Sequence, residues 1–518
     1  MEPPGEISVM DRAMNNPIIL SEIIKRSPLK TCRLVCQFWN EMVLSLPNTT
    51  LALNLEYEVG DYNAIPFFDL CFTLDDRLSK QIVATCTSAP SDENPSDWID
   101  IFAYRLTHVC DKFNDSVQIL EITVDYAACL QSVFQVLKNC CPNLKQLEIS
   151  YDLNEDESLD FNKEILLGPL LPKPKLTLLT VRSEVKVTPS LTSLLQLVVN
   201  ASPNLREATI PWGFCPDFAN SKLLGSLTVK LELTRRIEDA MAEFKPLELT
   251  RLLNQVADQL VNLGFSHFDH YGMNYNEAYD SGRRRVHLPK NMPKLQKLGN
   301  KMVDIFPLQD IKVLSALKTL EIGKIFKKSR VVDELLENMY RANEVFANVR
   351  NLTIFEIQNP KLVHGLKTAF PNLERLELDT RCEKDFNRAL ARMNLGVVLN
   401  ALKGWEGLKH LNLKLPNFSR KRDAIQTLLN AADLYKELKI LEIWICQEHY
   451  KRGDLTNYEM DQFEKLLVAM DGMDRVTIHD IYVSQDSRRK ILDFMVSKKM
   501  SVDKFKIFQG GLTCRDKL

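Results

Sequence analysis

One short run recurs along this chain: PNLKQLEI at residues 142–149 returns as PNLREATI at 203–210 and as PNLERLEL at 371–378. Each copy places apolar anchors in one order: an apolar residue, two variable residues, a second apolar residue, one variable residue and a third apolar residue. The last two anchors are two positions apart, so they point to one face of a strand, while the residue between them points to the other. The run predicts a short strand with one buried face, entered through a turn at the Pro–Asn pair.

The same anchor spacing recurs through most of the chain. The copies, named by their anchors, are Val117-Leu120-Ile122, Leu144-Leu147-Ile149, Leu176-Leu179-Val181, Leu205-Ala208-Ile210, Leu224-Leu227-Val229, Leu317-Leu320-Ile322, Val349-Leu352-Ile354, Leu373-Leu376-Leu378, Leu408-Leu411-Leu413 and Leu438-Leu441-Ile443, with Leu295-Leu298 and Val476-Ile478 as weaker members. Among the first anchors at 117, 144, 176 and 205, and at 317, 349, 373, 408 and 438, neighbouring anchors are 24 residues (Val349 to Leu373) to 35 residues (Leu373 to Leu408) apart, which leaves room for a helix of varying length in each unit.

Units of one strand and one helix that stack side by side build a parallel sheet with helices on its other face. The pattern resembles a leucine-rich-repeat protein, and the predicted fold is an α/β solenoid with the parallel sheet on the concave face and helices outside. We expect this irregular solenoid over residues 110–510, with a connecting and N-terminal capping region at 51–109. A polar and aromatic stretch interrupts the repeats, and we interpret it as an insertion near 264–290.

Composition excludes several classes of protein. The chain has 518 residues, and 66 Lys plus Arg against 68 Asp plus Glu give a net charge of -2, which argues against nucleic acid as the main partner. No secretory signal and no membrane-spanning run is visible, so we expect a cytoplasmic or nuclear protein without a membrane partner. The 12 cysteines are scattered, as expected of reduced thiols in such a compartment.

The N-terminal residues 12–50 predict a small all-α motif. Pro17 stands where a proline opens a helix, and Pro28 interrupts the first helix before a second one begins. Apolar residues of the second helix recur at helical spacing and share one face: Cys32, Val35, Cys36, Trp39 and Val43. A segment this short cannot bury so much apolar surface by itself, so the face is expected to contact something else.

This segment resembles the F-box, the helical motif that binds the Skp adaptor of an SCF-type, cullin-RING ubiquitin ligase. The family's opening proline, its apolar first helix and its Arg-Leu-Val-Cys-x-x-Trp signature, here residues 33–39, are all present. The stretch between the two helices is shorter than the family pattern by about one helical turn. The resemblance implies adaptor contacts by Pro17, Leu20, Ile23, Ile24, Leu34, Val35 and Trp39.

F-box motifs joined to leucine-rich repeats form a family of ubiquitin-ligase substrate receptors. The resemblance therefore implies a non-catalytic substrate-recognition subunit that needs no cofactor and binds the adaptor and an unknown target protein. The alternative is a leucine-rich-repeat scaffold without a role in ubiquitin transfer, whose N-terminal helices only cap the first hydrophobic face of the array. Burial of Leu20, Val35 and Trp39 against the first repeats would favour the scaffold, and their exposure without cover from the chain would favour the adaptor.

Residues between and just after the last two anchors should project from the sheet toward the target. We expect a target-binding surface formed by Glu321, Phe355, Glu377, Asp379, Glu442 and Trp444. Its carboxylates would receive a basic, partly apolar segment, with the two aromatic residues as anchors. The alternative is that the glutamates are ordinary solvent-facing residues and that the aromatic residues are buried under the C-terminal segment.

The sequence contains no phosphate-binding glycine loop and no hydrolase nucleophile motif. His267, Asp269 and His270 supply too few ligands at zinc spacing, so we interpret them as a surface loop and expect no metal site. The adjacent Cys140 and Cys141 are interpreted as structural thiols.

Overall fold

The structure is a computed structural model, and the chain divides into two compact units, Met1–Phe244 and Lys245–Leu518. It describes residues 16, 39, 41–42, 51–55, 71, 73–77, 79–87, 95–151, 168–183, 187–231, 245–267, 286–301, 309–323, 331–355, 357, 359–379, 395–415, 421–445, 454–479 and 483–507. Of the predicted adaptor contacts, Trp39 is described, and Pro17, Leu20, Ile23, Ile24, Leu34 and Val35 lie outside the described residues.

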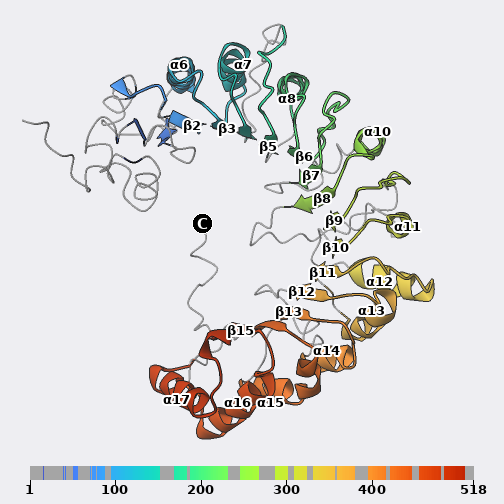
Figure 1. The fold of residues 1–518 in the computed structure, drawn as a ribbon. Coiled ribbons are helices and arrows are strands. Elements are labelled where there is room, and N and C mark those ends of the chain that lie inside the picture. Colours follow the sequence, from blue (N-terminus) through green and yellow to red (C-terminus); the bar gives the residue numbers. More distant parts are fainter. Residues whose placement is uncertain are drawn as a thin grey trace, which may run out of the picture. The chain divides into compact units, whose positions relative to one another are not determined.

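The first unit is a parallel sheet whose strands follow one another in chain order (Figure 1). Its elements are β1 (Leu51–Asn54), β2 (Ser79–Cys86), α6 (Pro95–Lys112), β3 (Ile119–Val124), α7 (Cys129–Asn139), β4 (Gln146–Tyr151), β5 (Leu178–Ser183), α8 (Pro189–Ala201), β6 (Glu207–Pro211) and β7 (Ser226–Leu231). Helices α6, α7 and α8 lie on one face of this sheet, which confirms the predicted α/β repeat.

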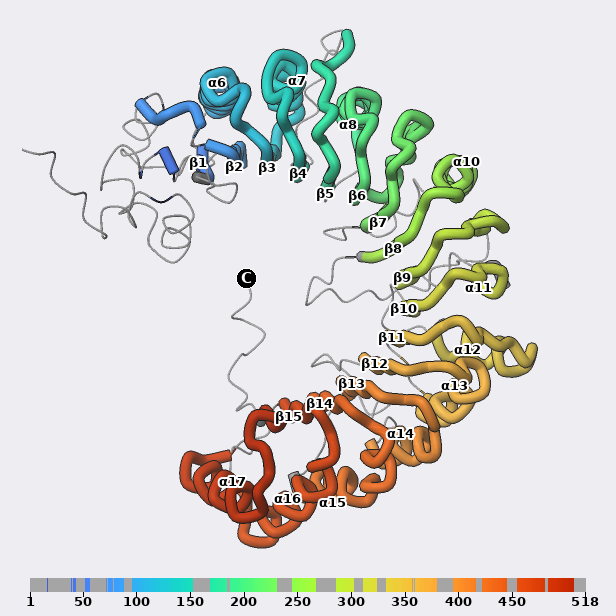
Figure 2. Tube along the Cα trace, viewed as in Figure 1, coloured from blue at the N-terminus to red at the C-terminus, as the bar shows by residue number. Residues whose placement is uncertain are grey.

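The second unit repeats the arrangement. Its elements are α10 (Pro246–Val256), β8 (Asn262–His267), β9 (Lys297–Asn300), α11 (Gln309–Lys312), β10 (Thr319–Ile322), α12 (Val331–Arg341), β11 (Asn351–Phe355), η3 (Pro360–Leu362), α13 (Val363–Ala369), β12 (Arg375–Asp379), α14 (Leu395–Leu402), β13 (His410–Leu415), α15 (Lys421–Leu429), η5 (Ala432–Lys436), β14 (Ile440–Ile445), α16 (Asn457–Met470), β15 (Arg475–His479), α17 (Gln485–Ser497), η6 (Val502–Lys504) and β16 (Phe505–Ile507). Figure 2 follows the succession of strand and outer segment through this unit.

The apolar anchors hold the strands in register. Leu376 of β12 pairs with Leu352 of β11 and with Leu411 of β13, and the ladder continues to Leu441 of β14. These four side chains are 0% to 1% exposed. Burying a leucine side chain contributes about 1.5–3 kcal/mol, so this ladder is the main attraction between neighbouring units.

The Pro–Asn turns have a second role that the spacing alone does not indicate. The side-chain amide Nδ2 of Asn372 donates to the carbonyl oxygen of Ala347, which occupies the turn of the preceding unit, at 2.8 Å. The same bond recurs at Asn143, Asn204 and Asn348, at 2.8 to 2.9 Å. Each asparagine thus satisfies a turn carbonyl that would otherwise lack a protein partner and ties its unit to the one before it.

The helices show the apolar stripes and caps that such a repeat needs. In α7, Leu130, Val133, Phe134 and Leu137 are buried at helical spacing. Helix α16 begins with a capping box, in which the backbone N–H of Thr456 donates to Glu459 at 2.8 Å and the N–H of Glu459 donates to Thr456 at 3.3 Å. No helix in the described part of the chain is long and apolar enough to cross a membrane.

Two boundaries differ from the sequence expectation. The sheet starts at β1 and β2, inside the region 51–109 assigned to connection and capping. The anchor pattern did not reveal β2 because two of its buried positions hold the small residues Ala84 and Cys86 in place of large apolar anchors. Residues 262–267, at the edge of the expected insertion near 264–290, form strand β8, which pairs with β9 and buries Leu263 and Phe265. The insertion itself stays a prediction, because residues 268–285 lie outside the described part.

Candidate functional site

The predicted target-binding residues lie on the second unit's sheet, on strands β10 to β14. Strand pairing places Glu321 beside Thr353, Glu377 beside Asn412, and Asn412 beside Glu442, in one row across the sheet. We call this row, which also includes Thr477 of β15, the middle row. The next outward position along each strand forms a second row, the end row, which consists of Phe355, Asp379, Lys414, Trp444 and His479.

The carboxylates on this face already have cationic or hydrogen-bonding partners on the sheet. Glu321 forms an ion pair with Lys297 at 2.7 Å, and Glu377 forms one with Lys414 at 3.1 Å. The expected acidic surface is therefore largely neutralised within the sheet. Sequence reasoning missed these pairs because the basic partner of each carboxylate lies on a neighbouring strand, more than twenty residues away along the chain.

Asp379 differs from its expected position on an open surface. Its side chain is 4% exposed, and Lys414 Nζ lies 3.3 Å from its Oδ2 atom. The Lys414 side chain is itself 18% exposed and bridges Asp379 and Glu377, so two acidic groups share one ammonium. A carboxylate buried this deeply requires such a partner, since an isolated charge in this environment is costly.

The two aromatic residues are held by stacking contacts. Trp444 stacks on His479 with ring centroids 3.7 Å apart and planes 12° apart, while Lys414 Nζ lies 5.8 Å from the Trp444 ring centroid. His479 Nε2 is also hydrogen-bonded to Glu442 Oε1 at 2.8 Å. These contacts fix the Trp444 ring and link the two rows.

Phe355 is held at the other side of the face. Lys301 Nζ lies 4.3 Å from the Phe355 ring centroid, a cation–π contact. A Cβ atom on Gly323 would lie 3.3 Å from the Phe355 side chain, so the glycine leaves room for this ring to pack against β10. The face therefore presents aromatic groups in fixed orientations, which costs little conformational entropy when a partner binds.

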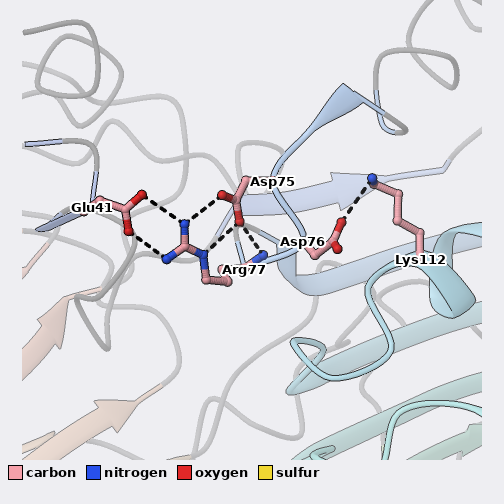
Figure 3. A network of polar contacts seen from close by, with 5 residues as sticks. All are labelled: Glu41, Asp75, Asp76, Arg77 and Lys112. Atoms are coloured by element: carbon pink, nitrogen blue, oxygen red, sulfur yellow. Dashed lines mark hydrogen bonds and ion pairs between the residues drawn. The ribbon is translucent and has the colours of Figure 1, made fainter. Parts of the chain in front are cut away.

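A polar network joins Glu41 to residues 75–77, just before β2, and a neighbouring ion pair joins the same stretch to α6, as Figure 3 shows. Arg77 binds both carboxylate oxygens of Glu41, at 2.8 and 3.1 Å, and binds Asp75 at 2.9 Å, while Lys112 of α6 pairs with Asp76 at 3.1 Å. The hydrogen bonds to Asp75 and Glu41 raise the pKa of Arg77, and the bond from Arg77 lowers the pKa of Glu41. The pairs are exposed, so each contributes little to stability.

Trp39, two residues before Glu41, is helical and 7% exposed. Its indole is therefore covered within this chain and is not part of an open apolar surface. Leu20 and Val35, which the same comparison of adaptor and scaffold requires, lie outside the described residues. The remaining predicted adaptor contacts stay predictions.

The adjacent Cys140 and Cys141 are buried, and so is Cys110. Cys110 and Cys141 share a hydrogen bond, which together with burial raises the pKa of Cys110, while the bond from Cys110 lowers the pKa of Cys141. Lys173 is 1% exposed and donates from Nζ to the carbonyl oxygen of Cys140 at 2.5 Å, and burial lowers its pKa to about 8. These thiols face the core, so they offer no accessible nucleophile.

Metal-ligating residues do not gather in the described part of the chain: no group of three or more His, Cys, Asp or Glu residues is placed to hold an ion there. Of the histidine-containing loop considered in the sequence, Asp269 and His270 lie outside the described residues, and His267 ends strand β8.

Comparison with known proteins adds little. No family model and no curated protein matches this chain. Among solved structures, a protein from Bacteroides fragilis, determined as a structural-genomics target, is similar over 55% of this chain and 66% of its own chain, with 15% sequence identity and a TM-score of 0.29. The similarity thus spans just under two thirds of that protein, and at this TM-score it carries no argument about fold or function.

Proposed function

We propose that this chain is a non-catalytic substrate-recognition subunit of an SCF-type ubiquitin ligase. In this proposal residues 12–50 bind the Skp adaptor, and the strand face of the second unit binds a target protein. The observation that supports target binding is the pair of rows across β10 to β15, where polar and aromatic side chains stand in register on a rigid parallel sheet. Such a surface provides many fixed contacts to a protein segment, including two aromatic groups.

The receptor would act through proximity and would make or break no covalent bond. Holding a target near the ligase's ubiquitin-conjugating enzyme converts a bimolecular encounter into an effectively intramolecular one. Rigid attachment of the two binding regions matters for such a role, and the Glu41–Arg77 contact supplies one point of attachment between the N-terminal helix and the first strands. The proposed compartment is the cytoplasm or the nucleus, where these ligases work.

A second candidate is a protein-binding scaffold without a role in ubiquitin transfer. The observation that favours it is the burial of Trp39, at 7% exposure, since a capping helix packs its aromatic residue against the array. The two candidates share the target-binding face and differ at the first helix of residues 12–50.

The test is co-purification of the full chain with a Skp adaptor. The variant is Leu20→Asp with Ile23→Asp, which places two charges on the apolar face of the first predicted helix and leaves Trp39 intact. A matched control, Leu247→Asp, introduces an acid at an apolar residue of the second unit that is 84% exposed. Circular dichroism and thermal melting check that all three proteins are folded.

We expect the wild type and Leu247→Asp to retain the adaptor at micromolar concentration and the double variant to lose it. If the folded wild type does not bind, the receptor proposal is wrong and the scaffold becomes the better account. Retention by the double variant would show that adaptor binding, if real, does not use the predicted helix.

A further inference from the structure

Each of the strands β12 to β15 has a residue on the same face two positions before its residue in the middle row. On three of these strands that residue is cationic or can become so, and sequence reasoning did not select it. Pairing aligns Arg375 of β12 with His410 of β13, His410 with Ile440 of β14, and Ile440 with Arg475 of β15. We call Arg375, His410 and Arg475 the basic row. It lies beside the middle row on the same sheet and contains no carboxylate.

The side chains of the basic row make few polar contacts within the described part of the chain. Within the described part of the chain, the side chains of His410 and Arg475 make no hydrogen bond or ion pair, and the closest carboxylate contact of Arg375 is a long one, 3.9 Å to Glu377. Arg475 is exposed, and the Arg375 side chain is 53% exposed. These cations are therefore available to an outside group.

The nearby acids are already engaged. Glu374 lies 2.5 Å from Arg350 and 3.5 Å from Lys409, and Glu377 is bound by Lys414. These ion pairs offset part of the negative charge of the face, whereas the basic row has one long carboxylate contact, from Arg375 to Glu377. The sequence prediction concerned the acids of the other two rows, and the basic row adds positive charge beside them.

His410 lies between the two arginines in the order of the strands. Burial lowers the pKa of His410, and repulsion from Arg375 and Arg475 lowers it further. Glu374 works against this shift and Lys409 adds to it. A negative group placed between the arginines would remove this repulsion.

We propose that the basic row binds an acidic, extended segment of the target protein, and this inference rests on the proposed role of the strand face in target binding. Strands are about 4.8 Å apart, so three strand steps separate Arg375 from Arg475 by about 14 Å. An extended chain advances about 3.3 Å per residue, so two Asp or Glu residues four positions apart match this separation. Ile440, between the arginines, offers an apolar contact to a residue in the middle of that segment.

The same arrangement argues against a nucleic acid as the occupant. A nucleic acid strand presents a continuous row of phosphates and needs a track of cations, whereas this row is short and lies beside the glutamates of the middle row. Separate carboxylates on a peptide can approach the arginines while its neutral residues pass the glutamates.

The experiment measures binding of a fluorescein-labelled deca-glutamate peptide to the full chain by anisotropy at low salt and pH 7. The variant is Arg375→Gln with Arg475→Gln. The matched control is Arg488→Gln with Arg489→Gln, which removes the same charge from exposed positions of helix α17. Deca-lysine and an oligo-dT of ten nucleotides serve as competing probes, and circular dichroism checks each protein.

We expect the basic-row variant to bind deca-glutamate at least tenfold more weakly than the wild type, and the α17 control to bind within twofold of it. Equal loss in both double variants, unchanged affinity in the basic-row variant, or tighter binding of deca-lysine or oligo-dT would overturn the proposal. The adaptor experiment reports on residues 12–50 alone, so its failure and the failure of this inference can be told apart.

Discussion

Removing Lys414 should destabilise the second unit, because this single ammonium balances two carboxylates on the strand face. Lys414 Nζ lies 3.1 Å from Glu377 and 3.3 Å from Asp379, whose side chain is 4% exposed. At an effective dielectric constant of about 20, each pair attracts by about 5 kcal/mol before solvation is counted. The desolvation of Lys414 offsets part of this, and removal of one partner from a buried pair typically costs about 3–5 kcal/mol.

Because Lys414 and Glu377 retain some exposure, at 18% and 16%, we expect Lys414→Met to lower the free energy of unfolding by about 2–4 kcal/mol at pH 7. The measurement is urea denaturation followed by circular dichroism.

A double-mutant cycle separates the ion pair from simple loss of packing. Asp379→Leu with Lys414→Met replaces both charges by apolar groups, and it should recover most of the stability that Lys414→Met loses. The control is Lys409→Met, whose ammonium is 48% exposed and lies 3.5 Å from Glu374, and it should cost less than about 1 kcal/mol. A loss below about 0.5 kcal/mol in Lys414→Met would refute the reasoning, since the acids would then not depend on this ammonium.

Three further predictions concern other parts of the fold. Burial lowers the pKa of Lys173 to about 8, so the charged amine is disfavoured in the folded state; stability should rise from pH 8 toward the unfolded lysine value of about 10.4, and Lys173→Met should lose that rise in denaturation at pH 7.5 and 10. Burial alone would raise the pKa of Asp454, but its hydrogen bonds from Ser484 and Ser487 outweigh this and hold the pKa below its usual value; Asp454→Asn should lower the thermal midpoint at pH 7, and the difference should begin to shrink only as the pH falls below the unfolded value of about 4, whereas a constant difference would contradict the linkage. In α13, a Cβ on Gly365 would lie 2.5 Å from the ring of Tyr340, so Gly365→Ala should cost about 1–3 kcal/mol in the same denaturation assay, and the gain expected from helix propensity alone would disprove the close packing.

Much of the fold follows from spacing that is local in the sequence. The three anchors of a unit lie within six residues, so their shared direction follows from the geometry of a strand and does not depend on the rest of the chain. The predicted copies from Val117-Leu120-Ile122 to Leu438-Leu441-Ile443 all form parallel strands with buried anchors, and the weaker members form β9 and β15. Where anchors were small or absent, as at Ala84 of β2, the spacing gave no signal.

The target-binding face was predictable in its position but not in its charge. Alternation along a strand identifies Glu321, Glu377 and Glu442 as residues of the face opposite the anchors. Which cation meets each of them depends on the register between strands separated by helices and loops of different lengths, and only the tertiary structure determines that register. The burial of Asp379 and of Trp39 is likewise a property of neighbours that are distant in the sequence.

The sequence by itself thus determined the repeating unit, because each unit's strand and turn are set by contacts among residues close together in the chain. The tertiary structure alone decided that the glutamates have partners on neighbouring strands and that His410 and Arg475 make no ion pair within the described residues, because electrostatic balance is a sum over neighbouring strands. The physical reason is that the direction and burial of the anchors depend on residues within one segment, whereas charge pairing depends on residues of neighbouring strands.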